Sequence, residues 1–111
     1  MFLSRKTNFY FLLLIPFVFL STPVVSGDIE KGKIKAELCQ GCHGVGGISV
    51  SSIIPNLAGQ KEEYLAVSLK AFKSGSRKNG IMSSVVTSIS DDDIADISAY
   101  YSSLSMGTKG E

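Results

Sequence analysis

The sequence predicts an all-α domain of three to four helices over residues 27–111, preceded by an export signal at residues 1–26. Three observations support this fold class. Apolar residues recur at helical spacing in residues 27–39, 60–74 and 90–104. Segments rich in glycine, proline or other turn-forming residues separate these stretches, and no β pattern of any length appears. The 85 residues after the signal include no tryptophan and bury only a small core, so a stabilising group is expected.

The first 26 residues have the composition of a secretory signal. Arg5 and Lys6 precede an apolar run at residues 9–20, and small residues lead up to Ser26. The run has 12 residues, which is too short to cross a bilayer comfortably, and Pro16 interrupts it. We therefore expect cleavage after Ser26 and a periplasmic protein that is not embedded in the membrane. The alternative is an uncleaved signal that anchors the protein to the membrane.

The charge of the domain argues against a nucleic-acid partner. The chain has 11 basic and 10 acidic residues, and two of the basic ones, Arg5 and Lys6, lie in the signal. Nine basic residues then face ten acidic ones, which gives the mature chain a formal net charge of −1. Because no basic surplus remains to neutralise phosphates, no nucleic acid is expected among the partners.

Residues 27–39 are predicted to form the first helix. Asp28 and Glu30 lie in its first turn, where negative charge is favourable to the helix dipole. One face carries the residues at i, i+3, i+7 and i+10, namely Ile29, Gly32, Ala36 and Cys39. Gly32 and Ala36 are small, which predicts the close approach of a second helix. A weak point in the helix at Gly32 is the alternative.

The segment Cys39-Gln40-Gly41-Cys42-His43 carries the chemistry of the chain. A disulfide between the two cysteines closes a very small loop and constrains the unfolded chain little. A dithiol oxidoreductase needs a βαβ context, and a zinc site needs a fourth ligand that this chain lacks. The remaining interpretation is covalent haem attachment, of which C-x-x-C-H is the signature. Two cysteines three residues apart on a helical turn can each form a thioether, and His43 can ligate the iron.

Residues 44–59 are predicted to form a loop, because glycine and proline are dense there. The loop nevertheless contains apolar Ile53, Ile54 and Leu57. We expect these side chains to pack against the edge of the haem, with an ordinary core contact as the alternative.

The second helix is predicted over residues 60–74. Leu65, Leu69 and Phe72 form its apolar stripe, and Gly75 follows as a C-cap. Acidic residues lie at its start and lysines at its end, as the helix dipole favours. Residues 76–80 are predicted to form a turn-rich basic linker.

The last helix is predicted over residues 90–104. Ser90 is the expected N-cap, and Asp93 is its partner at the third helical position. The apolar face consists of Ile94, Ile97, Tyr101 and Leu104. The aspartates at 91–93 lack the spaced ligands and glycine of a calcium loop, so a helix start is the better interpretation. Residues 105–111 are expected to form a polar tail.

The second axial ligand of the iron determines what the haem can do. The chain has one histidine, so a bis-histidine site within one chain is excluded. Met1 lies in the signal and Met106 follows the last helix, whereas Met82 lies in a loop between the two C-terminal helices. Such a loop can place a thioether across the opposite face of the haem. Position alone does not decide between this role for Met82 and that of core filler.

These features together resemble a class I cytochrome c, specifically the small bacterial monohaem type that is similar to one domain of the dihaem periplasmic cytochromes. The resemblance covers nearly all of residues 27–104. It is carried by Gly32-Lys33, Cys39-Gln40-Gly41-Cys42-His43-Gly44, Pro55-Asn56-Leu57-Ala58-Gly59-Gln60, Tyr64-Leu65, Phe72-Lys73-Ser74-Gly75-Ser76-Arg77, Met82, Ser90-Asp91-Asp92-Asp93-Ile94-Ala95-Asp96-Ile97 and Tyr100-Tyr101. The family often has glutamine in place of Ser68, and its dihaem members have two haem motifs where this chain has one.

The resemblance implies a small cytochrome c fold wrapped around one covalently attached haem. It assigns the haem to Cys39 and Cys42 and the iron ligands to His43 and Met82. It also implies that the Pro55 carbonyl accepts a hydrogen bond from the second imidazole nitrogen. The first and last helices are expected to cross at Gly32, packed by a tyrosine at 100 or 101, and Arg77 is a candidate partner for a haem propionate.

Histidine–methionine ligation implies an electron carrier rather than an enzyme, because no iron position remains open for a substrate. The expected partners are redox proteins, namely a quinol-oxidising complex as donor and a terminal oxidase or reductase as acceptor. One alternative is a haem-bearing subunit of a larger oxidoreductase, or a membrane-anchored electron donor to one. Another is a haem sensor or peroxidase with a replaceable ligand.

Overall fold

This computed structural model describes residues 16–21 and 26–107. These residues form five α-helices and two single turns of 3₁₀ helix, joined by loops. In chain order they are α1 (Ile29–Lys35), α2 (Glu37–His43), η1 (Val45–Gly47), α3 (Glu62–Ser74), α4 (Gly80–Val85), η2 (Val86–Ser88) and α5 (Asp91–Ser103). The described residues include no strand. The all-α prediction is therefore confirmed, with two more helical segments than the three expected from periodicity.

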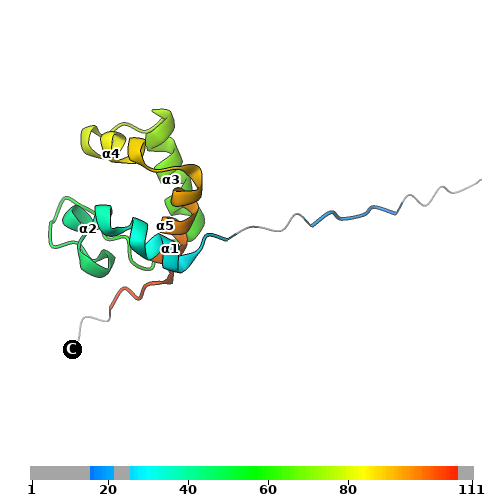
Figure 1. The fold of residues 1–111 in the computed structure, drawn as a ribbon, viewed down its shortest axis with the longest axis horizontal. Helices are drawn as coiled ribbons and strands as arrows, with labels where there is room; N and C mark the ends of the chain where they lie inside the picture. The colour runs from blue at the N-terminus through cyan, green and yellow to red at the C-terminus, as the bar shows by residue number, and fades with distance from the viewer. Residues whose placement is uncertain (1–15, 22–25, 108–111) are drawn as a thin grey trace, which may run out of the picture.

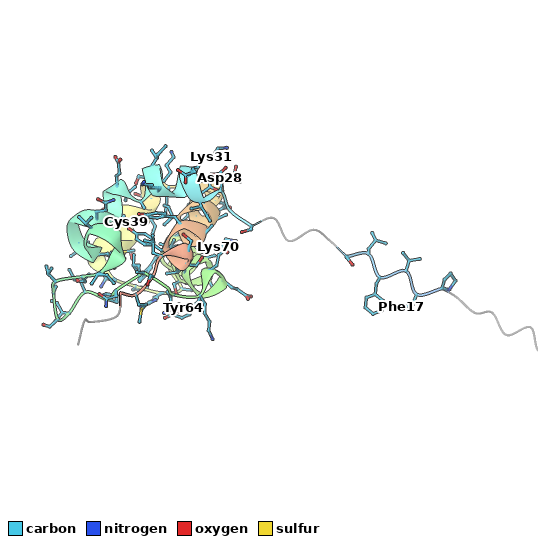
Figure 2. The ribbon with its side chains drawn as sticks, turned by 90° about the horizontal axis from the view of Figure 1, so that it is seen from below. Phe17, Asp28, Lys31, Cys39, Tyr64 and Lys70 are labelled. Carbon is cyan, nitrogen blue, oxygen red and sulfur yellow. The ribbon has the colours of Figure 1, made fainter. Side chains whose placement is uncertain are left out.

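The first additional segment arises because the predicted helix over 27–39 is not continuous. α1 ends at Lys35, and Ala36 serves as both its C-cap and the N-cap of α2. Asp28 is the N-cap of α1 rather than a first-turn residue, and its carboxylate accepts a hydrogen bond from the backbone N–H of Lys31 at 2.9 Å. Figure 2 shows Asp28 and Lys31 side by side at the start of this helix.

The second additional segment lies where a loop was expected. Asn79 caps α4, its side chain accepting hydrogen bonds from the backbone N–H groups of Ile81 and Met82 at 3.1 and 3.0 Å. The chain continues through η2 into the start of α5. The prediction of a loop around Met82 is therefore wrong, because a local asparagine cap begins a short helix there.

The caps of the two long helices follow the sequence pattern. α3 ends at Ser74, and its C-cap is Gly75, whose φ of +82° lies in the left-handed region that favours glycine. α5 begins with a full capping box: the Ser90 hydroxyl accepts from the Asp93 N–H, and the Asp93 carboxylate accepts from the Ser90 N–H. Both predicted helix ends are confirmed. α3 starts at Glu62, two residues later than expected.

α1 crosses α5 with the two backbones in direct contact, as the small residues of α1 predict. Gly32 is buried at the crossing, and a methyl group in its place would collide with the backbone carbonyl of Asp96 and with the Cβ of Tyr100. The Asp28 N–H donates to Asp96 Oδ1 at 2.7 Å, which fixes the start of α1 on the same helix. Figure 1 shows α1 lying across α5 at the base of the domain.

One hydrophobic cluster joins the helices. Its buried members are Ala36, Leu65, Val86, Ile89, Ile94, Ile97, Tyr100 and Tyr101. The Tyr101 hydroxyl donates to the carbonyl of Ala36 at 3.4 Å, so α5 also holds the junction of α1 and α2. The apolar stripes predicted for the second and last helices therefore meet in a common core.

The loop between α2 and α3 departs partly from expectation. Leu57 packs against the core, and its N–H donates to the Gly47 carbonyl at 2.8 Å. Ile53, in contrast, is 89% exposed and is not part of the hydrophobic core, so an ordinary core contact is wrong for this residue, and its packing against the haem edge stays a prediction. The backbone turns that bring Leu57 to the core leave Ile53 on the outer side of the loop.

Most of the predicted export signal, including Arg5 and Lys6, lies outside the described residues, and the cleavage after Ser26 stays a prediction. Residues 16–21 are described and are not helical. Within residues 16–21 and 26–107, no helix has both the length and the apolar character required to cross a lipid bilayer.

Candidate functional site

Side chains from α2, α3, α4 and α5 enclose one large apolar cavity, which has about 850 Å³ of empty space including solvent at its mouth. In the view of Figure 1, α4 lies above α2, and α3 and α5 lie to the right of both. The lining residues are Leu38, Cys39, Cys42, His43, Pro55, Leu57, Leu65, Ser68, Leu69, Phe72, Arg77, Ile81, Met82, Val85, Ile97 and Tyr101.

α2 brings both cysteines to the cavity. Cys39 and Cys42 are three residues apart, so they lie on the same face of the helix. Both thiols are free, and Cys39 is partly buried while Cys42 is exposed. Burial raises the pKa of the Cys39 thiol above its ordinary value, and a hydrogen bond with Tyr101 partly offsets that effect. In Figure 2, Cys39 lies among the packed helices.

His43 is the last residue of α2 and is only 8% exposed. Its Nδ1 lies 2.8 Å from the carbonyl oxygen of Pro55. A carbonyl can only accept a hydrogen bond, so Nδ1 carries the proton and Nε2 keeps its lone pair for a metal. The contact that the resemblance implied between His43 and Pro55 is present in the structure.

The loop places Pro55 opposite His43 through its own hydrogen bonds. The side chain of Asn56 accepts from the Ser49 N–H at 2.7 Å, which closes the loop across seven residues. The N–H groups of Leu57 and Ala58 both donate to the Gly47 carbonyl, at 2.8 and 3.1 Å. These contacts hold the three residues that follow Pro55 against Gly47 and Ser49, and so help to position the carbonyl that orients the imidazole.

Met82 lines the same cavity from α4 and packs partly buried against the core. It follows His43 by 39 residues in the chain, and its helix α4 is separated from α2 in Figure 1. Met106, in contrast, is 63% exposed and does not line the cavity. Of the two methionines in the described residues, only Met82 lies at the cavity with the histidine.

The donor set fits a haem c. Two thiols, one imidazole with a free Nε2 and one thioether line a cavity whose other walls are almost wholly apolar. Thiols suit attachment to a porphyrin, and imidazole with thioether is an established ligand pair for haem iron. The five predicted site residues, Cys39, Cys42, His43, Pro55 and Met82, all line this one cavity.

The cavity also includes residues that sequence reasoning had assigned to the core or had not considered. Leu65, Leu69, Phe72 and Ile97 belong to predicted apolar stripes, and they serve as cavity walls as well as core. Leu38, Ile81 and Val85 were not predicted. No local signal distinguishes a core stripe from the wall of a cavity, because both require the same apolar residues at the same spacing.

Comparisons with known proteins agree with this site. The cytochrome c family model matches residues 29–105. Cytochrome c-554(548) from Halomonas halodenitrificans is 46% identical over 81 residues, which cover 70% of this chain and 98% of that protein. Cytochrome c4 from Pseudomonas aeruginosa is 42% identical over 81 residues, which cover 73% of this chain and 40% of the relative.

A solved structure shares the fold. The reduced recombinant cytochrome c4 from Pseudomonas stutzeri superposes with a TM-score of 0.69 at 40% identity, covering 72% of this chain and 47% of that one. The chain thus spans less than half the length of these two cytochrome c4 proteins. The chain belongs to the cytochrome c family, as an all-α electron-transfer domain with one covalently attached haem c.

Proposed function

We propose that this protein carries single electrons between partner proteins and is not itself an enzyme. In this proposal Cys39 and Cys42 would hold the haem through thioether bonds, and His43 and Met82 would ligate its iron. The observation that supports it most directly is that His43 and Met82 line one cavity from opposite helices, with the imidazole already oriented by Pro55.

The chain's own residues determine what the cofactor can do. When bound, haem c supplies a one-electron iron couple, and a thioether ligand gives it a higher potential than two nitrogen ligands do. Pro55 keeps His43 in the tautomer with a free Nε2. The Met82 thioether would be the second iron ligand, and it would leave no iron position open to exogenous ligands or substrates. The apolar walls exclude water, so the surroundings need little rearrangement when the charge changes.

The proposed location is the periplasm, reached by cleavage of the signal after Ser26. The proposed donor is a quinol-oxidising complex and the proposed acceptor is a terminal oxidase or reductase. Encounters with such partners are expected to be brief and to use a small contact area. A protein that keeps its signal as a membrane anchor would serve the same reaction at the membrane surface.

A second candidate function is that of a haem-bearing subunit in a larger oxidoreductase. It is favoured by a relative named cytochrome subunit of sulfide dehydrogenase from Chlorobaculum tepidum, which is 37% identical over 76 residues. Another relative, from Stutzerimonas stutzeri, is named thiosulfate dehydrogenase electron acceptor and is 33% identical over 76 residues. A subunit would purify in a stable complex, whereas a carrier would purify alone, so the mass of the native protein in solution separates the two.

The central test compares Met82→Ala with Met106→Ala in exported protein. We expect wild type and Met106→Ala to show covalent haem and a thioether–iron charge-transfer band in the oxidised state. Met82→Ala should keep the covalent haem but lose the band and bind carbon monoxide when reduced, because its axial position is open. A colourless wild-type protein, or a band that survives in Met82→Ala, would contradict the proposal. Carbon monoxide binding by the reduced wild type would instead favour a sensor or peroxidase.

A further inference from the structure

The segment that contains the expected cleavage point is seated on the folded domain. The Ser26 hydroxyl donates to Glu62 Oε1 at 3.1 Å, and the Asp28 N–H donates to Asp96 Oδ1 at 2.7 Å. The first contact is to the first residue of α3, and the second is to the middle of α5. The backbone of Gly27, between Ser26 and Asp28 in the chain, is therefore held between two carboxylates.

Gly27 lies directly on the backbone of α5. A Cβ built at this residue would collide with the Ala95 carbonyl and with the backbone nitrogen of Asp96. Gly27 is partly buried, whereas Ser26 and Asp28 on either side of it are exposed. Only a residue without a side chain fits so close to the helix, so this contact gives the Gly27 backbone a defined place on the domain.

The two carboxylates have no cationic partner from the described part of the chain. Neither of the ion pairs found in residues 16–21 and 26–107 includes Glu62 or Asp96. Around these contacts, the other charged residues of the three helices are Asp28, Glu30 and Lys31 at the start of α1, Lys61 and Glu63 at the start of α3, and Asp92 and Asp93 of α5. Glu62 is also partly buried, which reduces the screening of its charge by solvent.

Cleavage after Ser26 would place a cation beside these carboxylates. Hydrolysis breaks the C–N bond between Ser26 and Gly27, and the added water completes a carboxylate on Ser26 and an ammonium group on Gly27. An α-amino group has an ordinary pKa of about 7.7 to 8.0, so it is largely protonated at neutral pH. The same cut removes the Ser26 hydroxyl from Glu62 and leaves the new ammonium group next to that carboxylate.

We propose that the Gly27 ammonium group, created by cleavage after Ser26, binds the carboxylates of Glu62 and Asp96 and holds the start of α1 against α3 and α5. In the uncleaved chain the Gly27 nitrogen is an uncharged amide, so this ion pair belongs to the processed protein alone. The inference rests on the cleavage that is part of the proposed function, and it is independent of the haem ligands.

The test uses the exported holoprotein in its reduced, diamagnetic state. Its intact mass should correspond to a chain that begins at Gly27, and any other N-terminus would overturn the inference. In an NMR titration, the acid dissociation constant of the Gly27 α-amino group should be about tenfold lower than that of an unperturbed α-amino group. Glu62→Gln should raise this constant about threefold, as expected for a partly screened ion pair.

Glu63→Gln is the matched control, because it removes the same charge one residue later in α3, from an exposed side chain. It should change the dissociation constant by less than about 1.5-fold. Asp96→Asn removes the other charge and keeps an oxygen that can accept from the Asp28 N–H, so it should resemble Glu62→Gln. If wild type, Glu62→Gln and Glu63→Gln gave the same constant, the ion pair would be refuted.

Denaturant titrations separate the ion pair from the helix dipole, which both glutamates at the start of α3 also favour. Because the folded pKa of the α-amino group is expected above its unfolded value, the stabilisation is complete below about pH 7.7 and is lost as the pH rises through the folded pKa. At pH 6 the equilibrium constant for unfolding should be about threefold larger in Glu62→Gln than in Glu63→Gln. At pH 10 the two constants should be equal, and a ratio that did not change with pH would contradict the inference.

This inference and the proposed function fail separately. A wild type without the Met82-dependent absorption band contradicts the role of electron carrier, whatever its N-terminus. A wild type that keeps the band but has an unperturbed Gly27 α-amino group contradicts only the ion pair.

Discussion

At the crossing of α1 with α5, backbone lies against backbone, whereas α4 reaches the cavity without burying any of its own residues. The crossing is tied by the Asp28–Asp96 hydrogen bond at 2.7 Å and by the Lys35–Asp93 ion pair at 3.4 Å. α4 depends instead on the Asn79 cap and on partial packing of Met82. Because stability is not uniform within a fold, we infer that the crossing maintains the domain while α4 depends more on the bound haem.

The largest effect on the free energy of unfolding is expected from a substitution at the crossing of α1 with α5. Gly32→Ala places a methyl group against the Asp96 carbonyl and the Tyr100 side chain, so α1 and α5 must separate. We expect a loss of about 3 kcal/mol in the free energy of unfolding, measured by denaturant titration of the holoprotein. Gly41→Ala is the matched control, because an added methyl group meets nothing within 4 Å and replaces a helical glycine. A gain of up to about 1 kcal/mol is expected there. Equal effects from both substitutions would contradict backbone contact at the crossing.

A smaller effect is expected from the helix caps, and here the two regions should respond differently. Asn79→Ala and Ser90→Ala each remove a capping side chain, at a cost of about 1 kcal/mol. Asn79→Ala acts on α4, so the absorption band that depends on Met82 should disappear on heating before the far-ultraviolet circular dichroism changes. In Ser90→Ala, both signals should disappear together at a lowered temperature. If the absorption band and the circular dichroism signal disappeared at the same temperature in both variants, α4 would not unfold as a separate unit.

The smallest effect is a pH dependence at the crossing. The Ser90 N–H, which donates to Asp93 Oδ2 at 2.9 Å, lowers the pKa of that carboxyl, and the Ser90 hydroxyl and Lys35 lower it further. Because the folded pKa lies below the unfolded value of about 3.9, the stabilisation is complete above that value. It is lost as the pH falls through the folded pKa.

Denaturant titrations of wild type and Asp93→Asn at pH 7 and at pH 3 measure this contribution. The wild type should be the more stable at pH 7, and the difference should shrink at pH 3. A difference that is the same at both pH values would mean that the Asp93 charge does not contribute.

Much of the site was predictable from short-range patterns. The spacing of Cys39, Cys42 and His43 identified the haem attachment motif without any knowledge of the fold. The residues alone left Met82 undecided, and the resemblance to the family selected it. The structure then placed Met82 at the cavity and the exposed Met106 away from it. The roles of these residues as ligands stay predictions.

Other parts of the site required the packed chain. The break at Ala36 was not visible in the periodicity of residues 27–39, and Tyr101, which donates to the Ala36 carbonyl, lies 65 residues away. The approach of Pro55 to His43 depends on loop hydrogen bonds to Gly47 and Asn56. No local pattern of residues marks the break at Ala36 or these loop hydrogen bonds, and the contact between Pro55 and His43 was expected only from the resemblance to the family.

By itself the sequence determined the helical class, the ends of α3 and α5, and the haem motif, because periodicity, caps and ligand spacing are local properties of the chain. Tertiary structure alone decided where α1 gives way to α2 and which of the apolar residues line the cavity. Those features depend on residues far apart in the chain, so they become defined only when the helices pack.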